Sequence, residues 1–256
     1  MARAWLFCND VADFQLTQNL LVAAMPPESQ ARFAAAARVE EVQLAQRLFH
    51  EDEFPAYVFF PLDSVVSLMR TLEDGEMVEV GMVGPEGMIG VNAVLGVALN
   101  PHAGVCQGRG HLAFLPRDFV TEEMIREPRV NAILHHFIYA FYAGVSQLAA
   151  CNRRHNVEQR LAHWLLLLHD RVAADEMSLT HEFLAFMLAT RRAGITEAMS
   201  ALTAAGAIEP RRNRVCVVDR AKLESLSCEC YRAAYDEYER ALGFPPVAKG
   251  RRTPVD

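Results

Sequence analysis

The fold is decided by the stretch from Ser178 to Arg220, which reads SLTHEFLAFMLATRRAGITEAMSALTAAGAIEPRRNRVCVVDR. Two short amphipathic helices are predicted in it, one capped by Thr180 and one by Thr190, with Gly206 just beyond the end of the second. The apolar positions expected to be buried are Phe183, Leu184, Met187 and Leu188 in the first helix and Ile195, Ala198, Met199 and Leu202 in the second. Two short helices joined by a tight turn, with a basic start to the second, are typical of a helix-turn-helix.

The residues after the second helix predict a wing, in which two short strands (207–210 and 215–218) flank an arginine-rich tip. A recognition helix inserts its first turn into the major groove, while flanking arginines contact phosphates. We therefore expect DNA contacts from Thr190, Arg191, Arg192, Thr196 and Glu197 in the helix and from Arg211, Arg212 and Arg214 in the wing. The helix pair alone could be any αα-hairpin and the arginines a solvated loop, but their coincidence favours DNA binding.

Charge is distributed unevenly along the chain. The net charge is −7, but residues 1–155 hold 11 Lys and Arg against 18 Asp and Glu, whereas residues 156–256 hold 14 of each. Residues 178–222 hold 7 basic and 4 acidic side chains. A small basic module on an acidic body is what a DNA-reading domain requires.

The bulk composition excludes several classes of protein. At 256 residues, with 52% hydrophobic and 22% charged side chains, the chain is an ordinary folded protein. It contains no apolar run of the ~20 residues that a membrane-spanning helix needs, and no secretory leader is recognisable. Six cysteines without paired spacing indicate reduced thiols, so we expect a cytoplasmic protein that does not contact a membrane.

The residues before the helix-turn-helix fall into two regions. Residues 1–38 are expected to be helical, with a break at Pro26-Pro27. From about 42 to 120, short alternating runs are separated by turns such as Asp74-Gly75 and 84–87 (GPEG). Asp-Gly between apolar runs is a strong hairpin indicator, and many short strands at this spacing predict a β-sandwich or a barrel-like roll.

A long helix is predicted from Pro128 to about residue 155, and Asn156 with Gln159 resembles a capping box that starts the next helix. One row recurs at coiled-coil spacing and predicts a dimer interface: Leu134, Ile138, Phe141, Val145, Leu148 and Asn152. A second row, Ile133 and Phe137, would face the roll of the same subunit. A single core helix is the alternative, because the repeat is shorter than three heptads.

This order of elements resembles the Crp/Fnr family of bacterial regulators. The similarity covers about residues 15–225 and is carried by 74–75 (DG), 84–90 (GPEGMIG), 156–162 (NVEQRLA) and 179–208. It implies an α+β fold: a helix and a β-roll sensor domain like a cyclic-nucleotide-binding domain (1–126), a dimerisation helix and hinge (127–155), and a winged helix-turn-helix with a helical tail (156–256). It also implies a homodimer that binds palindromic double-stranded DNA and contacts RNA polymerase, while the sequence does not reveal whether a small-molecule effector exists.

Three departures from the family qualify that resemblance. Members that bind cyclic nucleotides carry a Gly-Glu pair for the ribose and an Arg-Ser or Arg-Thr pair for the phosphate, whereas here Gly90 precedes Val91 and residues 99–104 read LNPHAG. Because a buried phosphate needs a charged partner, cyclic AMP is not the expected effector, and Arg109 is the one nearby arginine that could take this role. Iron–sulfur members carry several N-terminal cysteines, where this chain has only Cys8.

The recognition helix departs as well. The family's usual Arg-Glu, followed four residues later by Arg, appears here as Arg192-Ala193 and Glu197. Arg192 can still address a guanine, but we expect a half-site that differs from the family's commonest one.

The remaining candidate sites favour simpler interpretations. Cys228 and Cys230 suggest a metal or redox site, but residues two apart on a helix point to different sides, and no other Cys or His lies nearby in the sequence. His135 and His136 could sense pH or bind haem, although surface histidines are the default. No phosphate-binding loop, nucleophile elbow or zinc-hydrolase motif occurs, so we expect no catalytic residue, cofactor or metal. The alternative function is a sensor or interaction protein that has lost specific DNA binding, which the arginine-rich tip argues against.

Overall fold

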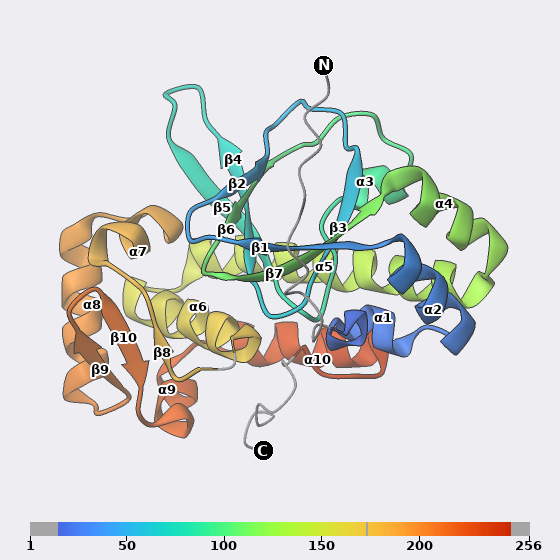
Figure 1. The fold of residues 1–256 in the computed structure, drawn as a ribbon. Coiled ribbons are helices and arrows are strands. Elements are labelled where there is room, and N and C mark those ends of the chain that lie inside the picture. The colour runs from blue at the N-terminus through green and yellow to red at the C-terminus, as the bar shows by residue number, and fades with distance from the viewer. Residues whose placement is uncertain (1–14, 173, 247–256) are drawn as a thin grey trace.

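The computed structural model describes residues 15–172 and 174–246, and the chain runs from a short helical lead through a β-roll to a mostly helical C-terminal half (Figure 1). The lead consists of a 3₁₀ turn (Leu16–Gln18), α1 (Leu20–Ala24) and α2 (Pro27–Ala36). The side-chain oxygen of Asn19 caps α1 by accepting from two N–H groups of its first turn. Of the region predicted to be helical, the first 14 residues lie outside the described part of the chain.

Seven strands form the roll as two antiparallel sheets. One sheet has the order β1-β7-β3 and consists of β1 (Arg38–Val42), β7 (Gly110–Pro116) and β3 (Tyr57–Pro61). The other has the order β2-β6-β4-β5 and consists of β2 (Arg47–Phe49), β6 (Ala103–Cys106), β4 (Val66–Thr71) and β5 (Met77–Val83). Gly75 has φ +85° in the turn between β4 and β5, so the hairpin predicted from Asp74-Gly75 is confirmed.

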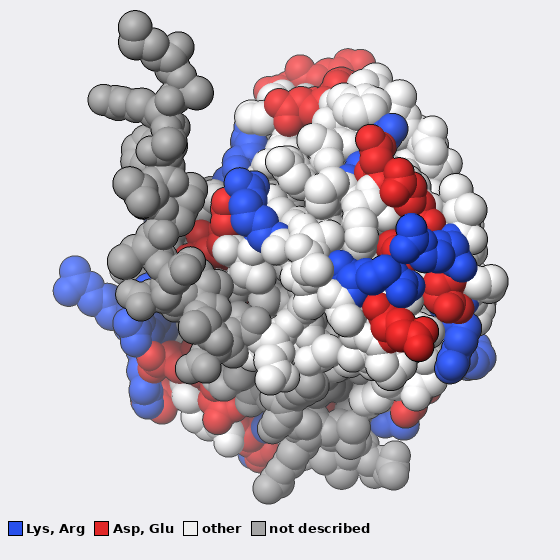
Figure 2. Space-filling view, turned by 45° about the vertical axis from the view of Figure 1, so that its right-hand side comes forward, with Lys and Arg blue, Asp and Glu red and all other residues white. Residues whose placement is uncertain are grey.

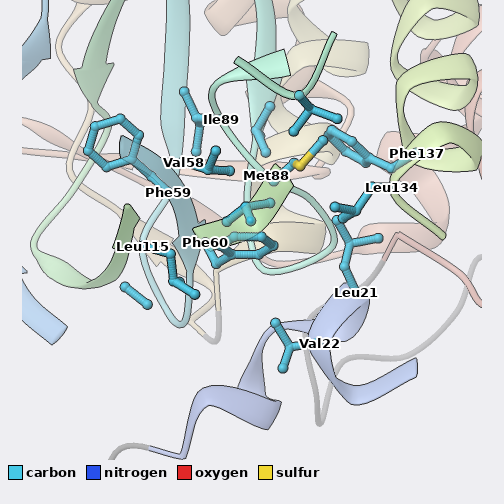
Figure 3. Packing of buried hydrophobic residues seen from close by; sticks show 14 of the residues in the cluster. Leu21, Val22, Val58, Phe59, Phe60, Met88, Ile89, Leu115, Leu134 and Phe137 are labelled. Atoms are coloured by element: carbon cyan, nitrogen blue, oxygen red, sulfur yellow. The ribbon is translucent and has the colours of Figure 1, made fainter. Parts of the chain in front are cut away.

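A single-turn helix, α3 (Val91–Val94), interrupts the roll. Two helices follow the roll: α4 (Arg117–Arg126) and the long α5 (Pro128–Arg154), which starts with its proline in the first turn as predicted. Leu134 and Phe137 project from α5 into the main core, beside Leu21 and Met88 (Figure 3). The inner face of α5 is therefore part of the core of the roll.

The C-terminal half is built on a second core. Its elements are α6 (Val157–Arg171), β8 (Glu176–Met177), α7 (His181–Met187), α8 (Arg192–Ala204), β9 (Ile208–Arg211), β10 (Arg214–Val217), α9 (Arg220–Leu226) and α10 (Cys230–Leu242). Both hydrogen bonds of the predicted capping box between Asn156 and Gln159 are present at the start of α6. The strands form a small sheet in the order β8-β10-β9. The α+β class, with a β-roll, a long helix and a winged helix-turn-helix, is thus confirmed.

The last helix, α10, returns along α5 (Figure 1). The hydroxyl of Tyr139 donates to Glu237 over 2.8 Å, and the rings of Phe137 and Tyr238 meet edge-on with centroids 6.1 Å apart. The sequence predicted a helical tail but did not place it. Its packing closes one side of α5 within the same subunit.

Two buried carboxylates fasten the roll to α6. Glu86 pairs with Arg171 over 2.8 Å, and both side chains are almost fully buried. Glu79 accepts hydrogen bonds from the Ser67 hydroxyl and the Trp164 ring N–H, each over 2.5 Å. Burial raises the pKa of Glu79 from 4.5 to about 7.

In the described chain, no helix combines the length and the apolar character needed to cross a membrane.

Candidate nucleic-acid interface

The helix-turn-helix is formed by α7 and α8, which pack through the apolar residues that the sequence singled out. Thr180 caps α7 as predicted, its hydroxyl oxygen accepting from the N–H of Phe183 over 3.1 Å. The buried residues of the pair are Leu184, Met187, Leu188, Ile195, Ala198, Met199 and Leu202, while Phe183 is half-buried. Since one face of α8 is fixed in this core, its opposite face is left for a partner.

The turn between the two helices corrects one detail. Ala189 has φ +46°, and the N–H of Thr190 donates to the carbonyl of Ala185 over 3.0 Å. Thr190 is thereby still part of the turn, and α8 begins two residues later, with Arg191 at the cap position and no side-chain cap. The prediction that Thr190 caps α8 is wrong. The first-turn N–H groups of α8 have no side-chain acceptor at the cap, which suits the approach of a phosphate.

Most of the residues predicted to read DNA lie exposed on the first two turns of α8. Arg191, Arg192, Thr196 and Glu197 are exposed, and Thr190 is half-buried. The Thr196 hydroxyl donates to the carbonyl of Arg192 over 3.1 Å and lies 3.1 Å from the ring of His181. The two arginines carry no ion pair within the described residues, so both guanidinium groups are available to an anion.

The wing has the predicted form. β9 and β10 pair antiparallel, Asn213 at the tip has φ +58°, and all three arginines are exposed. Arg211 and Arg214 both pair with Glu176, at 2.7 and 2.5 Å, and hold the pKa of that carboxyl below its usual range. Arg212 has no such partner in the described part of the chain. The wing therefore presents one unpaired and two paired arginines.

A groove joins the two sets of arginines. It encloses about 400 Å³ between α7, the start of α8 and the wing, and its lining includes Arg192, Arg211 and Arg214. The groove therefore brings together guanidinium groups from α8 and from the wing. By contrast, the side of the molecule with α2 and α4, which is turned forward in Figure 2, carries acidic and basic side chains intermixed.

The predicted dimer seam is only partly open to a partner. Leu134 is fully buried in its own subunit, so it cannot contribute contact surface, and its assignment to the interface is corrected. Phe141 packs so closely on β5 that a Cβ on Gly81 would lie 2.8 Å from its ring. Ile138, Val145 and Leu148 are half-buried and Asn152 is exposed. Ile133 is half-buried against the main core and Phe137 is fully buried in it, as expected for the inward row.

A different row of α5 is exposed. It has the same spacing of four and three residues and consists of His135, Tyr139, Tyr142, Ser146, Ala149 and Arg153. Tyr139 and Tyr142 expose 55% and 69% of their surface. This row lies about a quarter turn from the predicted one, since each helical residue rotates by about 100°.

The roll offers no arginine for a nucleotide phosphate at the expected places. Asn100 sits in the stretch where the phosphate pair would stand, and its side chain accepts from the buried Asn92 amide over 2.9 Å. Arg109 is exposed at the edge of the roll and pairs with Glu41 instead. The rings of Phe49 and Phe59 stack inside the roll with centroids 5.6 Å apart.

Folding also brings together cysteines that the sequence left apart. Cys151, His155, Cys228 and Cys230 offer ligand atoms that all lie within 4.8 Å of one another. Cys228 and Cys230 have no other Cys or His near them along the chain, because Cys151 and His155 belong to a distant segment that the return of α10 brings beside them. Only the prediction that α10 folds back on α5 could have revealed the cluster.

Comparisons with known families agree with this arrangement. Residues 39–127 match the cyclic nucleotide-binding domain, and residues 159–226 match the Crp-like helix-turn-helix domain. Together the two matches cover more than half of the chain, in the order in which the structure shows the roll and the winged motif. A search of curated proteins finds no match.

Similar solved structures share the fold. TTHB099 from Thermus thermophilus, a transcriptional regulator of the CRP family, has a TM-score of 0.62 at 17% identity and covers 82% of this chain and 99% of its own. FixK2 from Bradyrhizobium japonicum has a TM-score of 0.59 at 18% identity and covers 75% and 98%. CLP from Xanthomonas campestris, a c-di-GMP responsive global regulator, has a TM-score of 0.61 at 15% identity and covers 75% and 99%. The two domain matches and their order show that the chain belongs to the Crp/Fnr family of transcriptional regulators, which bind DNA and are not enzymes.

Proposed function

We propose that this chain is a homodimeric, sequence-specific regulator of transcription that reads DNA with α8 and anchors it with the wing. The observation that carries the proposal is the exposed start of α8, where Arg191 and Arg192 stand without ion-pair partners among the described residues, beside a groove lined by Arg211 and Arg214. Arg192 in the first turn is placed to contact a base, with guanine the best match for a guanidinium group. Thr196 and Glu197 follow one turn later and would meet neighbouring bases.

The wing arginines supply the sequence-independent part of binding. Arg212 is ready to meet a phosphate, whereas Arg211 and Arg214 must first exchange the Glu176 carboxylate for one. Because that exchange costs part of what the new contact provides, Arg212 is the strongest phosphate anchor of the three.

The dimer forms along α5. The row around Tyr142 is exposed, whereas the inner face of the helix is committed to the roll and another side to α10, which Gln147 meets at Cys230. Tyr139 lies at the border of the exposed row, because its hydroxyl also donates to Glu237 of α10. A twofold contact along this helix would present two copies of α8 to successive major grooves and would require palindromic half-sites.

The sensor half responds to something other than cyclic AMP. The roll matches the cyclic nucleotide-binding domain, but Asn100 stands in the stretch where the phosphate-binding pair is expected, and Arg109 is exposed and paired with Glu41. The phosphate of a cyclic nucleotide would therefore lack a buried cationic partner. RNA polymerase is the proposed partner on the promoter, and the cytoplasm is the proposed location.

A salt titration tests the proposal. The full chain is used to select duplexes from a random pool, and its affinity for the selected and the starting duplexes is then measured over a series of salt concentrations. We expect a palindromic sequence that is bound at least about a thousandfold more tightly than the starting pool. Equal affinity for selected and random DNA at every salt concentration would contradict sequence-specific reading. No binding even at low salt would favour the sensor or interaction protein.

A further inference from the structure

We propose that Cys151, His155, Cys228 and Cys230 form a structural zinc site that locks the C-terminal helix to the joint between α5 and α6. Three thiolates and one imidazole are a common zinc set, and soft sulfur ligands select zinc over magnesium or calcium. The three cysteines are between 1% and 4% exposed and pack against one another. A closed set of four protein ligands, with no open position, indicates a structural and not a catalytic metal.

The separations between these atoms fit a tetrahedron. With zinc–sulfur bonds of about 2.3 Å and zinc–nitrogen bonds of about 2.0 Å, two sulfurs lie about 3.8 Å apart and a sulfur and a nitrogen about 3.5 Å apart. The Sγ atoms of Cys151 and Cys228 are 3.5 Å apart, and Cys230 Sγ is 3.5 Å from His155 Nδ1. The other separations among the four ligand atoms are all below 4.8 Å, so a tetrahedral ion needs shifts of no more than about 1 Å.

The surroundings of the four ligands are those of a metal site. His155 turns Nδ1 toward the sulfurs, and its Nε2 lies 3.3 Å from the carboxylate of Glu229. A carboxylate behind a ligating histidine fixes the ring and its tautomer. The amide of Gln147 donates to Cys230 Sγ over 3.0 Å, and the buried ring of His163 lies 3.5 Å from Cys151 Sγ. The Gln147 amide thus stabilises a thiolate at Cys230, and the His163 ring does the same at Cys151 in the tautomer that carries its proton on Nδ1.

The site joins two segments that are far apart in the sequence. Cys151 lies in the last turn of α5 and His155 directly follows that helix, whereas Cys228 and Cys230 stand at the start of α10, 77 residues after Cys151 in the case of Cys228. A metal there would hold α10 along α5 and fix the joint from which the winged helix-turn-helix begins. Since such a site does not exist in the unfolded chain, binding energy adds to the stability of the fold.

The test uses the full chain, purified with a thiol reductant and without a metal-binding tag. Elemental analysis should find one zinc ion per chain. After removal of zinc, titration with cobalt(II) should give the visible bands of tetrahedral cobalt together with sulfur-to-cobalt charge transfer in the near ultraviolet. Added zinc should displace the cobalt and raise the melting temperature.

Variants locate the metal. Cys228→Ser and His155→Gln should each lower the affinity for cobalt at least tenfold, whereas Cys216→Ser in β10 and Cys106→Ser in β6 should leave it unchanged. A reduced wild-type chain that holds no zinc and takes up no cobalt would overturn the proposal, whatever the variants do. Equal metal content in Cys228→Ser and Cys216→Ser would also overturn it, because the ion would then be bound elsewhere.

Discussion

The winged helix-turn-helix and the long helix α5 present their surfaces by different means. α8 is held by α6 and α7, which lie close to it in the sequence, and its outer face carries the arginines that distinguish the motif. α5 is enclosed by the roll on one side and by α10 on another, through contacts such as Gln147 with Cys230, 83 residues apart. The reading surface is therefore a local property of the chain, whereas the free face of α5 depends on the whole fold.

This difference separates two functions that substitutions can break independently. Changes on the outer face of α8 should alter which DNA is bound without altering assembly. Changes on the free face of α5 should alter assembly and reduce all DNA binding, because two tethered readers bind a palindrome far more tightly than one.

The largest expected effect comes from Tyr142→Glu. Tyr142 is 69% exposed in the subunit, so the substitution spares the fold and places two charges against each other across a twofold contact. We expect monomers by light scattering and a loss of about 10²- to 10⁴-fold in affinity for a palindromic site.

Ile125→Glu is the matched control, since Ile125 is 85% exposed and belongs to α4, outside the exposed row of α5. It should stay dimeric. A Tyr142→Glu chain that remains a dimer would move the interface to the half-buried row around Val145.

The next effect concerns the joint between the two regions. Because burial raises the pKa of Glu79 to about 7, the folded protein binds more protons than the unfolded chain between about pH 4.5 and 7. The stability that the protonated carboxyl contributes is complete below that range and is lost as the pH rises through 7. Wild type should therefore lose up to about 3 kcal/mol relative to Glu79→Gln between pH 5 and pH 8 in denaturant titrations.

Glu122→Gln, at an exposed position of α4, provides the comparison for the loss of one carboxyl. It should leave the slope of stability against pH as in wild type. Parallel slopes for wild type and Glu79→Gln would show that Glu79 does not titrate in this range.

The smallest expected effect sharpens the description of the wing. Arg212→Ala should weaken binding to selected and random DNA alike and reduce the salt dependence by roughly one unit per lost contact. Arg211→Ala should do less, because Arg211 already pairs with Glu176 and Glu209. Arg126→Ala on α4 serves as the control for loss of an arginine. A larger effect of Arg211→Ala than of Arg212→Ala would mean that the Glu176 pair is released without cost.

The same contrast explains what the sequence could predict. The capping residues Thr180 and Asn156, the hairpin at Gly75 and the buried positions of α7 and α8 are local signals, and the structure confirms them. For α5 the periodicity predicted the helix but not its orientation, because Leu134 faces inward through contacts with the roll that no local pattern encodes. The cysteine cluster was missed for the same reason, since it exists only where α10 meets the end of α5.

The most direct test of the central claim is selection of DNA from a random library with wild type, Arg192→Ala and Arg212→Ala. Arg192→Ala should relax the base preference at one position in each half-site and cost about 1–3 kcal/mol per base contact on the wild-type site. Arg212→Ala should select the same sequence as wild type with lower affinity throughout. If Arg192→Ala selected an unchanged sequence while Arg212→Ala selected a different one, α8 would not be the element that reads DNA.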